Sequence, residues 1–145
     1  MISIILTGHG QFAFGLYSAA ELIVGPQENF KTVDFTQEMS TDELSEQLQH
    51  AINQLPKESE ILFLTDLLGG SPFRSSVELA MQRKGCEVIV GTNLQMLTQV
   101  LMEKDEYKTI TELATVALGW GKQGILSFKH KKNADTQRQE GGEGI

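Results

Sequence analysis

The chain has 145 residues, of which 40% are hydrophobic, and a formal net charge of −7 from 12 basic and 19 acidic side chains. This length predicts one globular domain, too short for two nucleotide-binding halves, and the acidic balance argues against a nucleic-acid or anionic-membrane binder. No run of about 18 apolar residues and no signal-peptide pattern occurs, which predicts a cytoplasmic location. Because Cys86 is the single cysteine and the three histidines are scattered, we expect no internal disulfide, no bound metal and no other cofactor.

Four short apolar runs alternate with longer amphipathic segments, a pattern that is typical of a parallel α/β sheet. Three runs are nearly continuous and predict strands covered on both faces, whereas the second is interrupted by polar residues and predicts an edge strand. The four predicted strands are Ile2 to Leu6, Phe30 to Phe35, Ile61 to Thr65 and Glu87 to Val90. Right-handed crossovers favour an open, mainly parallel sheet in the order 2-1-3-4, with helices on both faces.

Helical spacing of apolar side chains predicts helices between the strands and two more after the last strand, at residues 93–104 and 109–119. The second helix begins with capping-box spacing, in which the Ser40 hydroxyl bonds the Glu43 N–H and the Glu43 carboxylate reaches back. For the third helix, Ser71-Pro72 predicts a start with Ser71 as the N-cap and Pro72 at the first helical position.

The chain changes character after Gly119-Trp-Gly121, where basic residues and glycines become frequent. Gly124 to Phe128 is a candidate for one more strand, paired with its own sheet or exchanged with the sheet of a second subunit. We therefore expect a domain over residues 1–128 and a basic, glycine-ended, disordered tail over residues 129–145.

Two glycine-containing loops follow the first and third predicted strands, Thr7 to Gly10 and Thr65 to Pro72. Ligands of open parallel sheets bind beyond the carboxyl ends of the strands where the strand order reverses, so the predicted order brings His9 and Asp66 together. Imidazole is nucleophilic and takes up and releases a group near neutral pH. A carboxylate bonded to its Nδ1–H would leave Nε2 free to attack.

The second loop leads into the third helix, whose free N–H groups and dipole would attract an anion. Gly10, Gly70 and Ser71 are therefore the candidate phosphate-binding residues, since glycines let backbone and ligand approach closely. Nucleophilic histidine, orienting carboxylate and phosphate site together predict a phosphoryl carrier.

A rival motif, Gly8-x-Gly10-x-x-Ala13 with Asp34 downstream, matches the spacing of a dinucleotide-binding site. That motif gives His9 no role and leaves the second glycine loop unexplained. A non-catalytic dinucleotide-binding or regulatory domain is kept as an alternative, because a fold does not fix a function.

Segments Ile4–Gly15, Ile23–Gly25 and Ile61–Phe73 resemble the enzyme IIA domains of the mannose family of the bacterial sugar phosphotransferase system, a resemblance in layout over residues 1–128. It implies a cytoplasmic component of a phosphoenolpyruvate-dependent phosphotransferase system with a phosphohistidine intermediate. His9 would accept phosphoryl from the phosphorylated histidine-containing carrier protein and pass it to an enzyme IIB, with only an indirect connection to the membrane permease.

The resemblance also implies that His9 is modified at Nε2, that Asp66 orients it, and that Ser71 and adjoining backbone contact the phosphoryl group. It implies a homodimer that exchanges its final strand, here Gly124 to Phe128. Gly8 departs from relatives that carry a hydroxyl residue there. The related dihydroxyacetone kinase phosphocarrier, whose turn tends towards Ser-His-Ser, is a second alternative, and mannose, fructose, sorbose, gluconate or an amino sugar are all open as the sugar.

Overall fold

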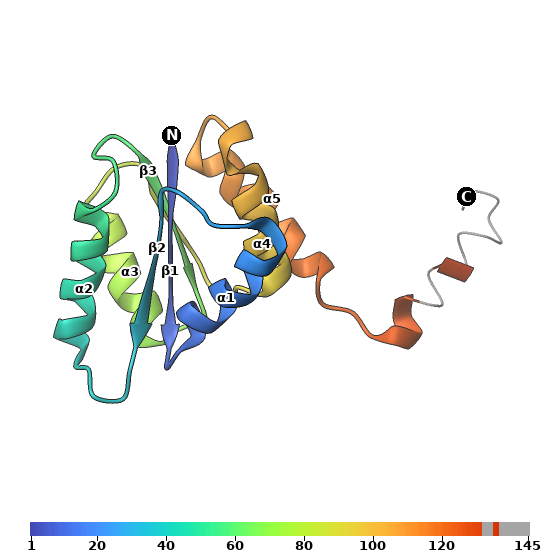
Figure 1. The fold of residues 1–145 in the computed structure, drawn as a ribbon, viewed down its shortest axis with the longest axis horizontal. Helices are drawn as coiled ribbons and strands as arrows, with labels where there is room; N and C mark the ends of the chain where they lie inside the picture. The colour runs from blue at the N-terminus through green and yellow to red at the C-terminus, as the bar shows by residue number, and fades with distance from the viewer. Residues whose placement is uncertain (132–134, 137–145) are drawn as a thin grey trace.

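The computed structural model describes residues 1–131, 135 and 136, and its body is one sheet between two layers of helices (Figure 1). The strands are β1 (Ile2–His9), β2 (Phe30–Phe35), β3 (Glu60–Thr65) and β4 (Cys86–Ile89). The helices are α1 (Phe12–Val24), α2 (Thr41–Asn53), α3 (Ser71–Met81), α4 (Leu94–Glu103) and α5 (Ile110–Gln123), with a 3-10 turn η1 (Lys104–Glu106) before α5. All four strands are parallel in the order β2-β1-β3-β4, which confirms the predicted fold class and strand order.

The two central strands are buried along nearly their whole length. In β1 every residue before His9 is buried, and in β3 every residue after Glu60 is buried. The strand β2 has one buried residue, Val33, as predicted for an edge. The prediction that the fourth strand is covered on both faces is wrong, because β4 forms the other edge and only Ile89 in it is buried.

Alternate residues of the central strands pack against opposite helix layers, because successive side chains of a strand point to opposite faces. Ile4 and Leu6 belong to the core beneath α1, α4 and α5, whereas Ile5 belongs to the core beneath α2 and α3. Figure 1 shows these two layers on opposite sides of the sheet. No helix in the described ranges is both long and apolar enough to pass through a membrane.

The helix starts match the predictions at α2 and differ by one residue at α3. The capping box is present, with Glu43 N–H donating to Ser40 Oγ at 3.1 Å and Ser40 N–H donating to Glu43 Oε1 at 3.4 Å. At α3 the N-cap is Gly70 rather than Ser71, because Gly70 is extended and its carbonyl accepts the bond from Arg74 N–H at 2.9 Å. Ser71 is thus the first helical residue.

The last helix extends beyond its predicted end at residue 119, to Gln123. Gly121, expected to mark a change in character, is buried, and a Cβ there would lie 2.7 Å from Met96 Cε of α4. The Gly121 carbonyl also accepts a bond from Asn93 Nδ2 at 2.9 Å. Gly121 therefore gives close packing between α4 and α5 rather than a break in the helix.

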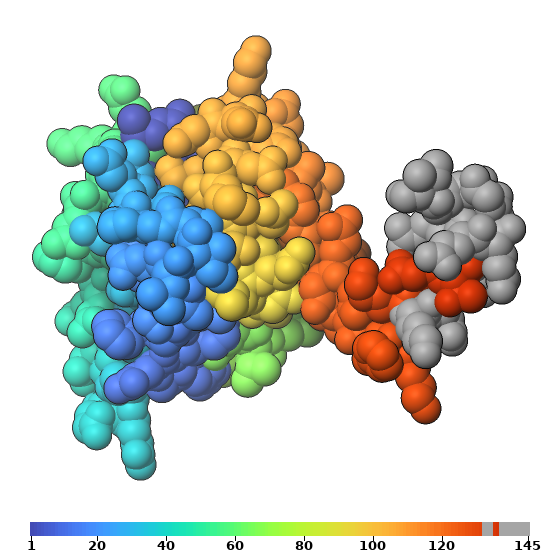
Figure 2. Space-filling view, turned by 45° about the vertical axis from the view of Figure 1, so that its right-hand side comes forward, coloured from blue at the N-terminus to red at the C-terminus, as the bar shows by residue number. Residues whose placement is uncertain are grey.

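Residues 124–128 do not form a strand with the chain's own sheet, which corrects one of the two pairings expected for them. Gly124 caps α5, residues 125–127 have no regular structure, and a helical turn covers 128–131. A strand needs a neighbour to pair with, and this segment leads away from the sheet (Figures 1 and 2). Of the tail predicted over 129–145, residues 132–134 and 137–145 lie outside the described residues.

Packing at the end of β1 leads to a prediction about Gly8. A Cβ at Gly8 would lie 2.4 Å from Phe12 Cδ1 and 2.9 Å from Phe12 Cβ, so Gly8→Ala requires the first turn of α1 to shift. We expect the free energy of unfolding in urea to fall by about 1–3 kcal/mol, the usual cost of overpacking. Gly15→Ala within α1 is the control, since nothing lies within 4 Å of its Cβ. A Gly8 variant as stable as the Gly15 variant would contradict this packing.

Candidate functional site

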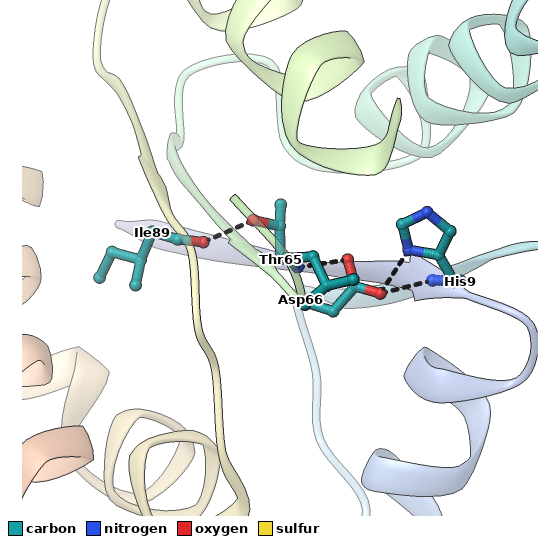
Figure 3. Close-up of polar contacts among 5 residues, drawn as sticks. His9, Thr65, Asp66 and Ile89 are labelled. Atoms are coloured by element: carbon teal, nitrogen blue, oxygen red, sulfur yellow. Dashed lines mark hydrogen bonds and ion pairs between the residues drawn. The ribbon is translucent and has the colours of Figure 1, made fainter. Parts of the chain in front are cut away.

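Strands β1 and β3 are parallel neighbours and end at the same edge of the sheet. Their register pairs Thr7 with Thr65, so His9 and Asp66 follow side by side. The chain enters β2 on one side of β1 and β3 on the other, which makes this edge the point where the strand order reverses. Figure 3 shows both side chains meeting there, beside the bond from Thr65 Oγ1 to the Ile89 carbonyl.

The Asp66 carboxylate makes three hydrogen bonds, and two of them link its loop to the loop of His9. Its Oδ2 lies 2.7 Å from His9 Nδ1 and also accepts the backbone N–H of His9 at 2.8 Å. Its Oδ1 accepts the N–H of Leu67 at 2.7 Å. Because one oxygen holds both the backbone and the ring of His9, the carboxylate fixes the turn and the imidazole together.

The pKa of Asp66 is lowered from its ordinary value of 3.8. Burial of this side chain, which is 10% exposed, would by itself raise the pKa. The hydrogen bonds from the His9 N–H, the imidazole and the Leu67 N–H, with attraction to a charged imidazole, outweigh burial and lower it. Asp66 is therefore an ionised carboxylate at neutral pH, which can only accept hydrogen bonds.

An ionised acceptor at Nδ1 determines where the imidazole carries its proton. Nδ1 donates to Asp66 Oδ2, so in the neutral ring the lone pair lies on Nε2. The His9 side chain is 44% exposed, which leaves it accessible from solvent. The arrangement presents one nucleophilic nitrogen, in one tautomer, at the surface of the protein.

Gly70 closes one side of the imidazole. A Cβ at Gly70 would lie 2.7 Å from His9 Cε1 and 3.4 Å from Nε2, so the ring rests against a backbone that only glycine provides. Nε2 consequently faces the start of α3, where no side chain caps the helix in the described part of the chain. The first N–H groups of a helix lack partners within it, and the dipole there attracts an anion.

The other two predicted phosphate-binding residues are placed differently. Ser71 is the first residue of α3, next to Gly70, and lines a polar hollow of about 310 Å³ between the starts of α2 and α3. Gly10 has φ +59° and its N–H donates to the Phe35 carbonyl at 2.7 Å. Gly10 therefore shapes the turn after His9, and a phosphate contact from its N–H would require that bond to break.

The sequence pattern missed one residue at the site. Phe35 ends β2 in register with His9, and its ring lies 5.8 Å from the imidazole, centroid to centroid, at an interplanar angle of 66°. The sequence indicated only that Phe35 belongs to an edge strand. Its place as the last residue of a strand beside β1 was the available signal.

The rival dinucleotide motif does not assemble. Asp34 Oδ1 accepts the Phe14 N–H at 3.1 Å and so caps α1 instead of facing a ribose. In the described ranges no group of three or more His, Cys, Asp or Glu side chains is arranged to hold a metal ion.

Comparison with known proteins agrees with this geometry. Residues 3–117 match the family model described as "PTS system fructose IIA component", where PTS is the phosphotransferase system. The chain is 35% identical to the sorbose-specific EIIA component of Lacticaseibacillus casei, over 96% of this chain and 99% of that protein. It is 33% identical to the mannose-specific EIIAB component of Escherichia coli, over 90% of this chain but only 40% of that longer protein.

A solved structure of EIIA from Streptococcus agalactiae has the same fold, with a TM-score of 0.82 and 34% identity. The likeness covers 89% of this chain and 98% of that one. The matched family model spans β1 to α5, including both loops that carry His9 and Asp66. The chain belongs to the mannose-type family of IIA components of sugar phosphotransferase systems.

Proposed function

We propose that this protein is a phosphohistidine carrier that works between two protein partners during sugar uptake. His9 accepts phosphoryl from a phosphorylated histidine-containing carrier protein and passes it to an enzyme IIB, which serves a membrane permease. The observation that carries this proposal is the 2.7 Å contact of His9 Nδ1 with Asp66, which leaves Nε2 as the free nucleophile. Such a carrier works in the cytoplasm, where both partners are found.

The phosphoryl transfer needs no cofactor, because one P–N bond forms as another breaks. The lone pair of His9 Nε2 attacks phosphorus, and a P–N bond forms as the donor's P–N bond breaks and returns its electron pair to the donor nitrogen. The His9 ring, still protonated at Nδ1, then carries positive charge, which the Asp66 carboxylate stabilises. In the second step a nucleophile of enzyme IIB attacks phosphorus, and the P–N bond breaks and returns its electron pair to His9 Nε2.

The start of α3 supports the phosphoryl group in this proposal. Nε2 faces Gly70, so a group attached there lies beside the backbone of Gly70 and Ser71. The helix dipole and the Ser71 hydroxyl offset the negative charge of the phosphoryl oxygens. In this role Ser71 and the adjoining backbone are phosphate-binding, and Gly10 acts through the turn.

The surroundings of His9 suit a protein partner. Leu67 and Leu68 follow Asp66 directly and are 63% and 77% exposed, so the loop that binds the imidazole carries exposed apolar side chains. Exposed apolar groups beside polar ones are typical of protein interfaces. The two curated relatives reported above are named for mannose and sorbose and the family model for fructose, so the proposal extends to no single sugar.

The family favours this function over both alternatives. Each relative reported above is a phosphotransferase-system component, which supports a sugar carrier over a dihydroxyacetone kinase subunit. Asp34 accepts a hydrogen bond from the Phe14 N–H and is not free to bind a ribose, which argues against a dinucleotide-binding domain.

We also propose a homodimer in which residues 124–128 pair with the sheet of the partner subunit. Ile125, Leu126 and Phe128 are 75%, 58% and 80% exposed in the single chain, a large apolar surface for a short segment. Both sheet edges, β2 and β4, have unpaired backbone groups on one side. An exchanged strand would cover the apolar side chains and pair one of those edges.

Phosphorylation of His9 is tested with phosphoenolpyruvate, enzyme I and the histidine-containing carrier protein, followed by intact mass and peptide mapping. The wild-type chain gains one acid-labile phosphate, and His9→Ala, which removes the nucleophile, gains none. Asp66→Ala is labelled about 10- to 100-fold more slowly, because the tautomer and orientation of the ring are lost. His50→Ala, on α2, is the control and labels at the wild-type rate. Normal labelling of His9→Ala would refute the proposal.

The lowered pKa of Asp66 predicts how stability depends on pH. A depressed folded-state pKa contributes stability that is present above the unfolded value of about 3.9 and is lost as pH falls through the folded value. Asp66→Asn should therefore be less stable than wild type at pH 7, and the difference should shrink as the pH falls below 3.8. Urea unfolding from pH 7 to pH 3 measures this, with the exposed Glu46→Gln as the control. A constant difference across that range would contradict the assignment.

The exchanged strand is tested by the mass of the full chain in solution. Sedimentation equilibrium should give twice the chain mass of 16.0 kDa for wild type, and Ile125→Asp with Phe128→Asp should give a monomer, because charges replace the buried apolar contacts. Leu22→Asp, at a side chain 91% exposed on α1, is the matched control and should remain dimeric. A monomeric wild type, or a double variant that still dimerises, would contradict the exchange.

A further inference from the structure

The ring of Phe35 lies edge-on to the reactive imidazole. The 5.8 Å centroid distance and 66° interplanar angle are those of a favourable T-shaped aromatic contact. The backbone fixes this contact, since His9 pairs with Phe35 in the sheet register and the Gly10 N–H donates to the Phe35 carbonyl at 2.7 Å. Phe35 also packs against the core beneath α2 and α3, and this packing restricts the motion of its ring.

The hydrogen bond to Asp66 does not by itself fix the imidazole. The terminal torsion of histidine is broad, so the ring can tilt about its Cβ–Cγ bond and move Nδ1 away from Asp66 Oδ2. The His9 side chain is 44% exposed, so nearly half of its surface meets no protein atom that would restrict this tilt. Gly70 restricts the imidazole ring at Cε1, and the Phe35 ring is a second group that the imidazole contacts.

We propose that Phe35 is a positioning residue for phosphoryl transfer. Its ring holds the imidazole in the orientation that places Nδ1 on Asp66 and Nε2 towards the start of α3. Asp66 selects the proton position, Gly70 gives the space, and Phe35 sets the plane of the ring. This inference rests on the proposed transfer through His9.

The chain offers well-matched variants for the test. Phe35→Leu and Phe35→Met keep an apolar side chain against the core but remove the aromatic ring, and Phe35→Tyr keeps the ring. Phe30→Leu makes the same change at the opposite end of the same strand, where Phe30 packs on Tyr17 with centroids 4.5 Å apart. The Phe30 variant therefore reports the cost of losing a phenyl ring from β2 without contact to His9.

Two measurements separate positioning from plain structural support. Nitrogen-15 NMR of the His9 imidazole reports the share of rings protonated at Nδ1, and steady-state transfer from the phosphorylated carrier protein gives kcat and KM. For both ring-free Phe35 variants we expect kcat to fall about two- to tenfold with KM unchanged, the size of one lost aromatic contact, together with a smaller share of Nδ1–H rings. Phe35→Tyr should restore both, and Phe30→Leu should lower only the melting temperature.

A wild-type His9 spectrum in the ring-free Phe35 variants would overturn the proposal, and so would a kcat equal to that of wild type. A drop in kcat shared by Phe30→Leu would likewise show a structural role. The NMR measurement needs no phosphoryl transfer, so it is independent of the proposed function. Failure of that function would be seen instead as labelling of His9→Ala.

Discussion

The parallel pairing of β1 with β3 is the constraint on which the rest of the structure depends. Both strands are buried on both faces, so their register cannot slip without exposing apolar side chains or burying polar ones. That register sets Thr7 opposite Thr65 and delivers His9 and Asp66 to one edge. The 2.7 Å contact between the imidazole and the carboxylate is thus a consequence of the sheet, and the two helix layers serve to hold it.

Small residues determine how closely the site closes around the imidazole. At Gly70 a Cβ would collide with His9 Cε1, and at Gly8 a Cβ would collide with Phe12. Phe12 accounts physically for the glycine at position 8, since its ring fills the space that a side chain there would need. The ring of His9 is contacted by Asp66, Gly70 and Phe35, and its Nε2 faces Gly70 at the start of α3.

The sequence predicts those features that depend on periodicity and chain direction. Continuous apolar runs predict the two central strands, and the expected order 2-1-3-4, which the structure has, places His9 beside Asp66. Features set by local backbone angles or by contacts between distant segments were missed. The N-cap at Gly70 depends on backbone angles, the extension of α5 depends on Gly121 packing against Met96, and the role of Phe35 depends on the register between two strands.

The site of a phosphoryl carrier must be reachable by another protein, whereas the pocket of many enzymes has to bind only a small molecule. Small ligands are bound in concave cavities that cover most of their surface. Here the reactive side chain is nearly half exposed and is followed in the chain by two exposed leucines, so another folded protein can bring its own phosphorylated side chain to Nε2. Reversible transfer also requires that the phosphoryl group be held weakly enough to leave. In the proposed function the start of α3 and the Ser71 hydroxyl would meet that need, because they would neutralise charge without enclosing the group.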